Sequence, residues 1–184
     1  MLLREVVGTK KKTPEVLDSM VEHIRYELTR SMEFLMVGNA WCETLDQPFR
    51  RLAEQSILES GLIHLRCLIE FLGDAPKGDR VMARDYLPSW DWTISGNLLQ
   101  VTHLHGRLAH LGVVRSSTEA TTDGGYSWRE WITTEAPTVL RAFRDFLVAL
   151  SVSSPVRYGV FVQPDPYSEP IDLIATLNQL VGPK

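Results

Sequence analysis

Three of the chain's five histidines fall in one stretch, 97–115, which reads NLLQVTHLHGRLAHLGVVR. At about 100° per residue, His103, Arg107 and His110 gather on one face of a helix, while His105 lies near the edge of the opposite face. That opposite face is apolar and consists of Val101, Leu104, Leu108 and Leu111. An imidazole can exchange protons near neutral pH, and a guanidinium binds phosphate oxygens. The stretch therefore predicts a helix with an apolar core face and a second face that meets a ligand or a partner.

Cleavage of RNA through its 2′-hydroxyl needs a base that takes the hydroxyl proton and a group that stabilises charge on the phosphate. His110 and Arg107 lie one helical turn apart and can point to one spot, so we predict that they, with His105, carry such chemistry. We expect His103 and Arg115 to contact the substrate, because local arginines offset the formal net charge of −4. The same residues also fit a hydrogen-bonded, non-catalytic seam in a dimer interface. Both interpretations stay open.

The sequence spacing of possible ligands shows which metal sites the chain could form. A carboxylate-bridged di-metal bundle needs a Glu three residues before an inward-facing His. The positions three residues before each histidine are Met20, Gly61, Gln100, Thr102 and Arg107. The sequence also has no glycine-rich phosphate loop and no HExxH motif. We therefore expect no metal and no cofactor, with a mononuclear site using His64 and either His103 or His110 kept as an alternative.

The segment GLIHLRCLIEFLG holds His64 and Cys67 among bulky apolar residues. We predict that His64 is a hydrogen-bonded interior histidine, the alternative being a ligand- or metal-binding bundle centred on it. Apolar surroundings raise the pKa of a thiol, so we expect Cys67 to be inert. Cys42 and Cys67 are predicted to be free thiols in a reducing compartment.

Composition places the chain among ordinary globular proteins. It has 184 residues, of which 44% are hydrophobic and 23% charged, so one domain over 1–184 with a substantial core is expected. No apolar run reaches the roughly 18 residues of a membrane span. The first residues, MLLREVVGTKKK, lack the order of a secretory signal. We expect a cytoplasmic protein without a membrane partner.

Periodicity predicts four main helices after a loose arm at 1–12. The first begins at Thr13-Pro14, a capping hydroxyl followed by proline, and runs to about residue 42. The second runs from about 48 to 72, with Gly73 as its C-cap, and should be the most buried helix. In the loop that follows, 73–92, a helical turn fits 81–86, and the tryptophans should plug one end of the bundle.

The third main helix begins near 93–95 and is followed by a polar connection at 116–126. The fourth begins at about 127 and should break or kink at Pro137. Its buried stripe should consist of Val139, Leu140, Phe143, Phe146, Leu147 and Leu150. The tail, 153–184, contains a stretch at 158–163 that has the composition of a lone strand, and a short helix at 171–181 that should dock on the bundle. The predicted fold is all-α, an antiparallel bundle of four main helices (13–152) with a docked C-terminal tail.

A family resemblance rests on three features taken together. GLIHLRCLIEFL is followed by a loop containing Asp79 and Asp85, and then by a third helix that ends in RLAHLGVVR. This order resembles uncharacterised bacterial relatives of the HEPN superfamily. The family's motif is an Arg four to six residues before a His. Here His110 matches the histidine, the position five residues earlier is His105, and Arg107 is three residues earlier.

The resemblance implies an all-α protein of a superfamily in which many members are RNases, toxins or nucleic-acid-associated partners. It also implies a homodimer whose two motifs form a metal-independent RNase site. Gly106 lies on the histidine-bearing face and would allow another backbone to come close, so we predict a homodimer through this face. RNA and a partner protein are the other expected partners. The alternatives are a non-catalytic homodimer that acts as an interaction or regulatory module, and the bundle centred on His64.

Overall fold

The computed structural model describes residues 12–73, 80–93, 128–163 and 172–182. These residues form α-helices and their connections, with no strand among them, so the prediction of an all-α fold is confirmed. The arm at 1–11, the predicted third helix and the connection at 116–126 lie outside the described residues.

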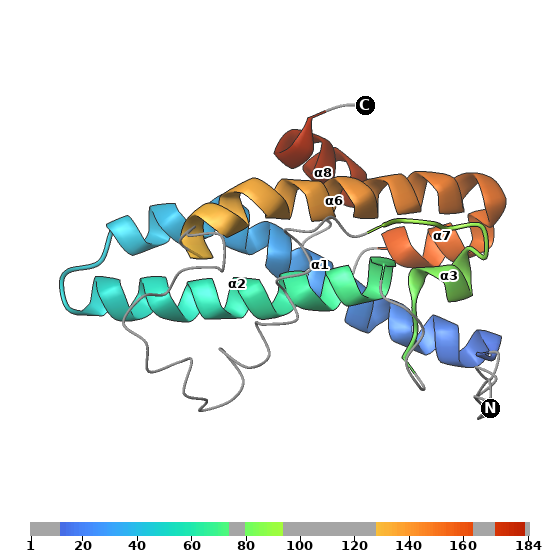
Figure 1. Cartoon of the computed structure of the whole chain (residues 1–184), viewed down its shortest axis with the longest axis horizontal. Helices are drawn as coiled ribbons and strands as arrows, with labels where there is room; N and C mark the ends of the chain where they lie inside the picture. The colour runs from blue at the N-terminus through green and yellow to red at the C-terminus, as the bar shows by residue number, and fades with distance from the viewer. Residues whose placement is uncertain (1–11, 74–79, 94–127, 164–171, 183–184) are drawn as a thin grey trace, which may run out of the picture.

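The first two helices, α1 (Pro14–Glu43) and α2 (Phe49–Gly73), form an antiparallel hairpin (Figure 1). α1 begins as predicted, because the Thr13 hydroxyl accepts a hydrogen bond from the Val16 amide at 3.5 Å. Its apolar stripe faces the core as expected. The fully buried members of this stripe are Leu17, Val21, Ile24, Leu28 and Met32.

The two helices of the hairpin approach closely at Gly61. A Cβ atom built at this position would lie 2.5 Å from Cγ of Phe34, well inside van der Waals contact. Only glycine fits there without a shift of the Phe34 ring. This close crossing determines which polar residues of α1 and α2 meet further along the hairpin.

The most central described helix is α6 (Trp128–Ser153) rather than α2, so the prediction that α2 is the most buried helix is wrong. α6 packs against α2, α7 and α8, whereas α2 keeps Phe49 and Leu52 on its outer side, 68% and 65% exposed. The predicted buried stripe of α6 is confirmed. Its members are Val139, Leu140, Phe143, Phe146, Leu147 and Leu150, each 0% exposed.

Pro137 lies inside α6 without interrupting it. A proline in a helix removes one backbone hydrogen bond and crowds the preceding turn. Ala136 and Val139 on either side of it are fully buried, so core packing holds the helix together across the proline. The expected break is therefore not observed.

The end of the molecule beyond α2 is closed by two short helices, α3 (Ala83–Tyr86) and α7 (Pro155–Val162). α3 confirms the helical turn predicted at 81–86. α7 covers most of 158–163, so the stretch with the composition of a lone strand is helical. Its first turn is set by Pro155, and the Tyr158 amide donates to the Ser154 carbonyl at 3.0 Å. Helical spacing turns Phe161 fully into the core, and this burial outweighs the strand propensity of the neighbouring valines.

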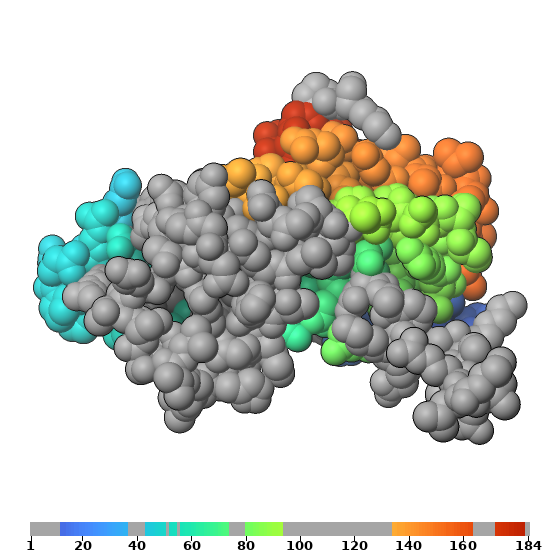
Figure 2. Space-filling view, in the orientation of Figure 1, coloured from blue at the N-terminus to red at the C-terminus, as the bar shows by residue number. Residues whose placement is uncertain are grey.

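Aromatic rings fill the space between α2, α3, α6 and α7. We call them the Phe146 cluster, which consists of Phe71, Tyr86, Trp90, Phe143, Phe146 and Phe161. The Phe146 ring lies 5.4 Å from Phe71 and 5.5 Å from Trp90, in edge-to-face contacts. Figure 2 shows residues 80–93 lying against α6 and α7 at this end. The prediction that tryptophans plug one end of the bundle is confirmed for Trp90, whose indole also donates to the Leu72 carbonyl at 2.9 Å.

The C-terminal helix, α8 (Leu173–Val181), docks on α6 through Leu173 and Leu177, which confirms the predicted docked helix. Asp172 caps it by accepting from the Ala175 amide at 3.0 Å. Arg144 of α6 is buried and donates to the Gly182 carbonyl at 2.5 Å, just beyond the end of α8. A buried guanidinium therefore anchors the far end of the tail.

Candidate functional site

The residues predicted to carry chemistry all lie outside the described part of the chain. This holds for His110, Arg107 and His105, and for the predicted substrate contacts His103 and Arg115. Their roles stay predictions. The described structure shows instead what the other chemistry-bearing residues, His64, Cys67 and the arginines of α2, are bonded to.

His64 meets Glu27 across the α1–α2 interface. Its Nδ1 lies 2.6 Å from Oε2 of Glu27, and the two side chains are 14% and 26% exposed. Tyr26 stands edge-on to the imidazole, with ring centroids 5.5 Å apart. The prediction of a hydrogen-bonded interior histidine is confirmed. The identity of its partner was not predicted, because Glu27 lies 37 residues earlier in the chain.

The bond to Glu27 determines that Nδ1 of the imidazole carries a hydrogen. A carboxylate can only accept, so Nδ1 carries the hydrogen and donates it. A carboxylate that orients an imidazole in this way is found in both catalytic and metal-binding histidines. No group of three or more metal-binding side chains occurs within the described ranges.

Cys67 lies one helical turn from His64 and also faces Glu27. Burial, followed by the negative charges of Glu27 and Glu70, raises the pKa of its thiol from 9.0 to about 11, while the positive charge of Arg66 opposes this shift. A raised pKa keeps the thiol protonated at neutral pH, which is the condition for the predicted inertness of Cys67. Cys67 is a free cysteine. The side chain of Cys42 lies outside the described part. We call Glu27, His64 and Cys67 the His64 seam.

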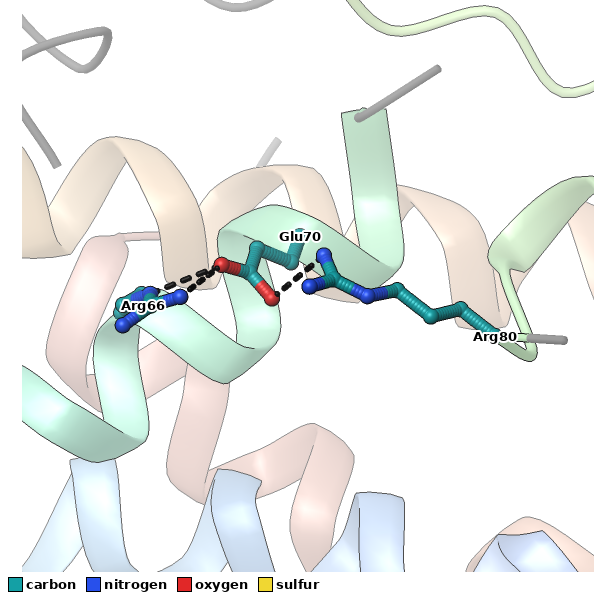
Figure 3. Close-up of polar contacts among 3 residues, drawn as sticks. All are labelled: Arg66, Glu70 and Arg80. Carbon is teal, nitrogen blue, oxygen red and sulfur yellow. Dashed lines mark hydrogen bonds and ion pairs between the residues drawn. The ribbon is translucent and has the colours of Figure 1, made fainter. Parts of the chain in front are cut away.

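A second polar group lies on the outer side of α2, where Arg66 and Arg80 both contact Glu70 (Figure 3). Arg66 contacts Oε1 at 2.7 Å, and Arg80 contacts Oε2 at 2.9 Å. The four-residue spacing of Arg66 and Glu70 signals a helical ion pair, but Arg80 lies outside α2 and nothing in the sequence pattern links it to Glu70.

Asp85, one of the two aspartates on which the family resemblance rests, has a structural role. Its carboxylate accepts from the Met82 amide at 2.9 Å and so caps α3. Asp79 lies outside the described residues.

Comparison with protein-family models, with curated proteins and with solved structures finds no match. Among the described residues, no helix is long and apolar enough to cross a membrane.

Proposed function

We propose that the protein is a HEPN-like, RNA-associated factor that cleaves RNA without a metal ion. The observation that carries this proposal is a sequence spacing: Arg107 stands three residues before His110, and a helix would bring the two side chains to one face, opposite an apolar face. The all-α fold is compatible with it.

In this proposal His110 takes the proton of the RNA 2′-hydroxyl as that oxygen attacks the adjacent phosphorus. The bond from phosphorus to the 5′-oxygen breaks, and the leaving oxygen takes up a proton from His105 or from water. Arg107 stabilises the charge on the phosphate through its planar fork of donors. A homodimer in which the two predicted helices face each other brings two copies of these residues together.

The test incubates the purified protein with a mixture of structured and unstructured RNA, with and without EDTA. His110→Ala should slow cleavage about 10²–10⁴-fold, because it removes the proton-transfer group. Arg107→Ala should weaken cleavage and Arg107→Lys should restore it only in part, since an ammonium cannot form the bidentate contact. EDTA should have no effect. His23→Ala, at an exposed position of α1, is the matched control and should retain full activity.

The second candidate is a non-catalytic homodimer that acts as an interaction or regulatory module, of the kind used in defence or toxin systems. One observation favours it: Phe49 and Leu52, one helical turn apart at the start of α2, are 68% and 65% exposed. Large apolar side chains exposed side by side can form part of a protein-binding surface. Wild-type protein that sediments as a dimer but leaves RNA intact, with His110→Ala still folded, would favour this module over the ribonuclease.

The dimer itself is tested by Gly106→Leu. If another backbone packs against Gly106, the larger side chain should dissociate or misalign the dimer in sedimentation at micromolar concentration. A wild-type protein that is monomeric under these conditions would contradict both candidates in their dimeric form.

A further inference from the structure

Two arginines from different parts of the chain converge on one carboxylate at the surface. Nε and Nη2 of Arg66, on α2, both contact Oε1 of Glu70 at 2.7 Å. Nη1 of Arg80, which precedes α3, contacts Oε2 at 2.9 Å. Figure 3 shows the two guanidinium groups on opposite sides of the carboxylate. The negatively charged Glu70 carboxylate therefore lies between the N–H donors of two guanidinium groups.

This arrangement fits a phosphate as well as a carboxylate. Arginine binds both groups through its planar fork, and pyrophosphate carries more negative charge than a carboxylate while a phosphodiester carries the same. The two non-bridging oxygens of a phosphodiester can take the places of Oε1 and Oε2. Within α1 and α2, Arg30 also pairs with Glu33, and Arg50 pairs with Glu54.

The position is accessible to solvent, and its two arginines are positioned by different elements: Arg66 by α2 and Arg80 by the segment that leads into α3. The side chains of Arg66, Glu70 and Arg80 are 22%, 28% and 46% exposed. Arg80 is held near α2 because α3 is anchored to the core: the buried Tyr86 hydroxyl donates to the Leu17 carbonyl at 2.6 Å. The two arginines would therefore stay close together if Glu70 moved aside.

We propose that Arg66 and Arg80 form a phosphate-binding position and that Glu70 is its internal competitor. The ligand is a phosphate group, carried either by an RNA backbone or by a free phosphate such as pyrophosphate. The RNA source rests on the proposed function, but the position itself depends neither on His110 nor on cleavage. Binding of a phosphate releases the Glu70 carboxylate to solvent, so Glu70 lowers the affinity of the position.

The experiment compares Glu70→Gln with Glu54→Gln in binding to a labelled single-stranded RNA and to pyrophosphate at low salt. Glu54 is the matched control, because it pairs with Arg50 on the same helix at the same spacing, 3.1 Å away. Glu70→Gln should tighten binding about 10-fold, the effect of one charge-assisted contact, and Glu54→Gln should not. Adding Arg80→Gln to Glu70→Gln should abolish the gain and reduce the salt dependence.

Measuring RNA and pyrophosphate separately distinguishes failure of this inference from failure of the proposed function. Tighter binding of pyrophosphate without any binding of RNA supports the phosphate position and contradicts the RNA association. Equal binding by Glu70→Gln and Glu54→Gln overturns the phosphate position and leaves Glu70 as a structural brace, whatever the outcome of the cleavage assay.

A second measurement on the wild type covers the case in which Glu70→Gln does not fold. Phenylglyoxal modifies exposed arginines, and peptide mapping gives the rate at each position. Pyrophosphate or RNA should slow modification of Arg80 relative to Arg30, whose side chain is 49% exposed and pairs with Glu33. Equal rates with and without ligand would overturn the proposal.

Discussion

The Phe146 cluster and the His64 seam both lie along α2, but the cluster joins α2 to its neighbours by apolar contacts and the seam does so by polar contacts. The cluster joins α2 to α3, α6 and α7 through ring contacts, and Phe143, Phe146 and Phe161 are completely buried. The seam joins α2 to α1 through one carboxylate that serves both His64 and Cys67. Apolar burial stabilises in proportion to area and tolerates changes of shape, whereas a polar contact requires its partner. We infer that the cluster supplies stability and the seam supplies the relative placement of α1 and α2.

The largest effect should come from truncating the centre of the cluster. Phe146→Ala should lower the free energy of unfolding by about 3–5 kcal/mol, because it removes a fully buried ring and leaves a cavity between four helices. Urea unfolding followed by circular dichroism measures the loss. Val148→Ala, at a 43% exposed position of the same helix, should change stability by less than about 0.5 kcal/mol. Similar losses in the two variants would contradict a stabilising role specific to the cluster.

An intermediate effect is expected from the seam. Glu27→Ala should cost about 1–3 kcal/mol, because it leaves the partly buried His64 Nδ1 and the Cys67 thiol without their acceptor. Glu33→Ala, which breaks the exposed pair with Arg30, should cost less than about 1 kcal/mol. Adding His64→Ala to Glu27→Ala should cost less than the sum of the two single changes. Additive losses would show that the two residues act separately.

The sequence pattern predicted much of what depends on local chemistry. Thr13-Pro14 marked the start of α1, and the apolar stripe of α6 was read correctly, because capping and helical periodicity are properties of neighbouring residues. α7 was missed because its valines favour a strand, and only packing against the cluster decides for a helix. The same limit applies to burial: α2 leaves Phe49 and Leu52 exposed while the stripe of α6 is fully buried, and periodicity does not encode this difference.

The polar sites divide in the same way. The hydrogen-bonded state of His64 could be predicted, since a buried imidazole needs a partner. Its partner Glu27 and the Arg80–Glu70 contact could not be predicted, because each pair joins residues that are not neighbours on one helix. His110 and Arg107 are identified by type and spacing alone, and their geometry lies outside the described residues.

The smallest effect, and the finest test of the seam, concerns Cys67. Its pKa in the folded protein is about 11, raised from 9.0 mainly by burial and then by the charges of Glu27 and Glu70. A raised pKa means that folding favours the thiol, so this contribution to stability is complete below about pH 9 and is lost as the pH rises through 11. The wild type should therefore lose stability relative to Cys67→Ser between these two values. Taking the difference between the two proteins cancels the titration of other groups.

Alkylation sharpens the same prediction. Iodoacetamide reacts with thiolates, so peptide mapping of the folded protein should show slow modification of Cys67 near pH 8 and a rise only above about pH 10. Glu27→Gln should shift this rise to lower pH, because the amide carries no negative charge. Phe146→Leu should leave it in place, since the cluster supplies none of the charges that raise this pKa. A rise near pH 8.5 in the wild type would mean that the Cys67 thiol is not held in the seam, and the contrast between the two regions would then reduce to one of apolar area.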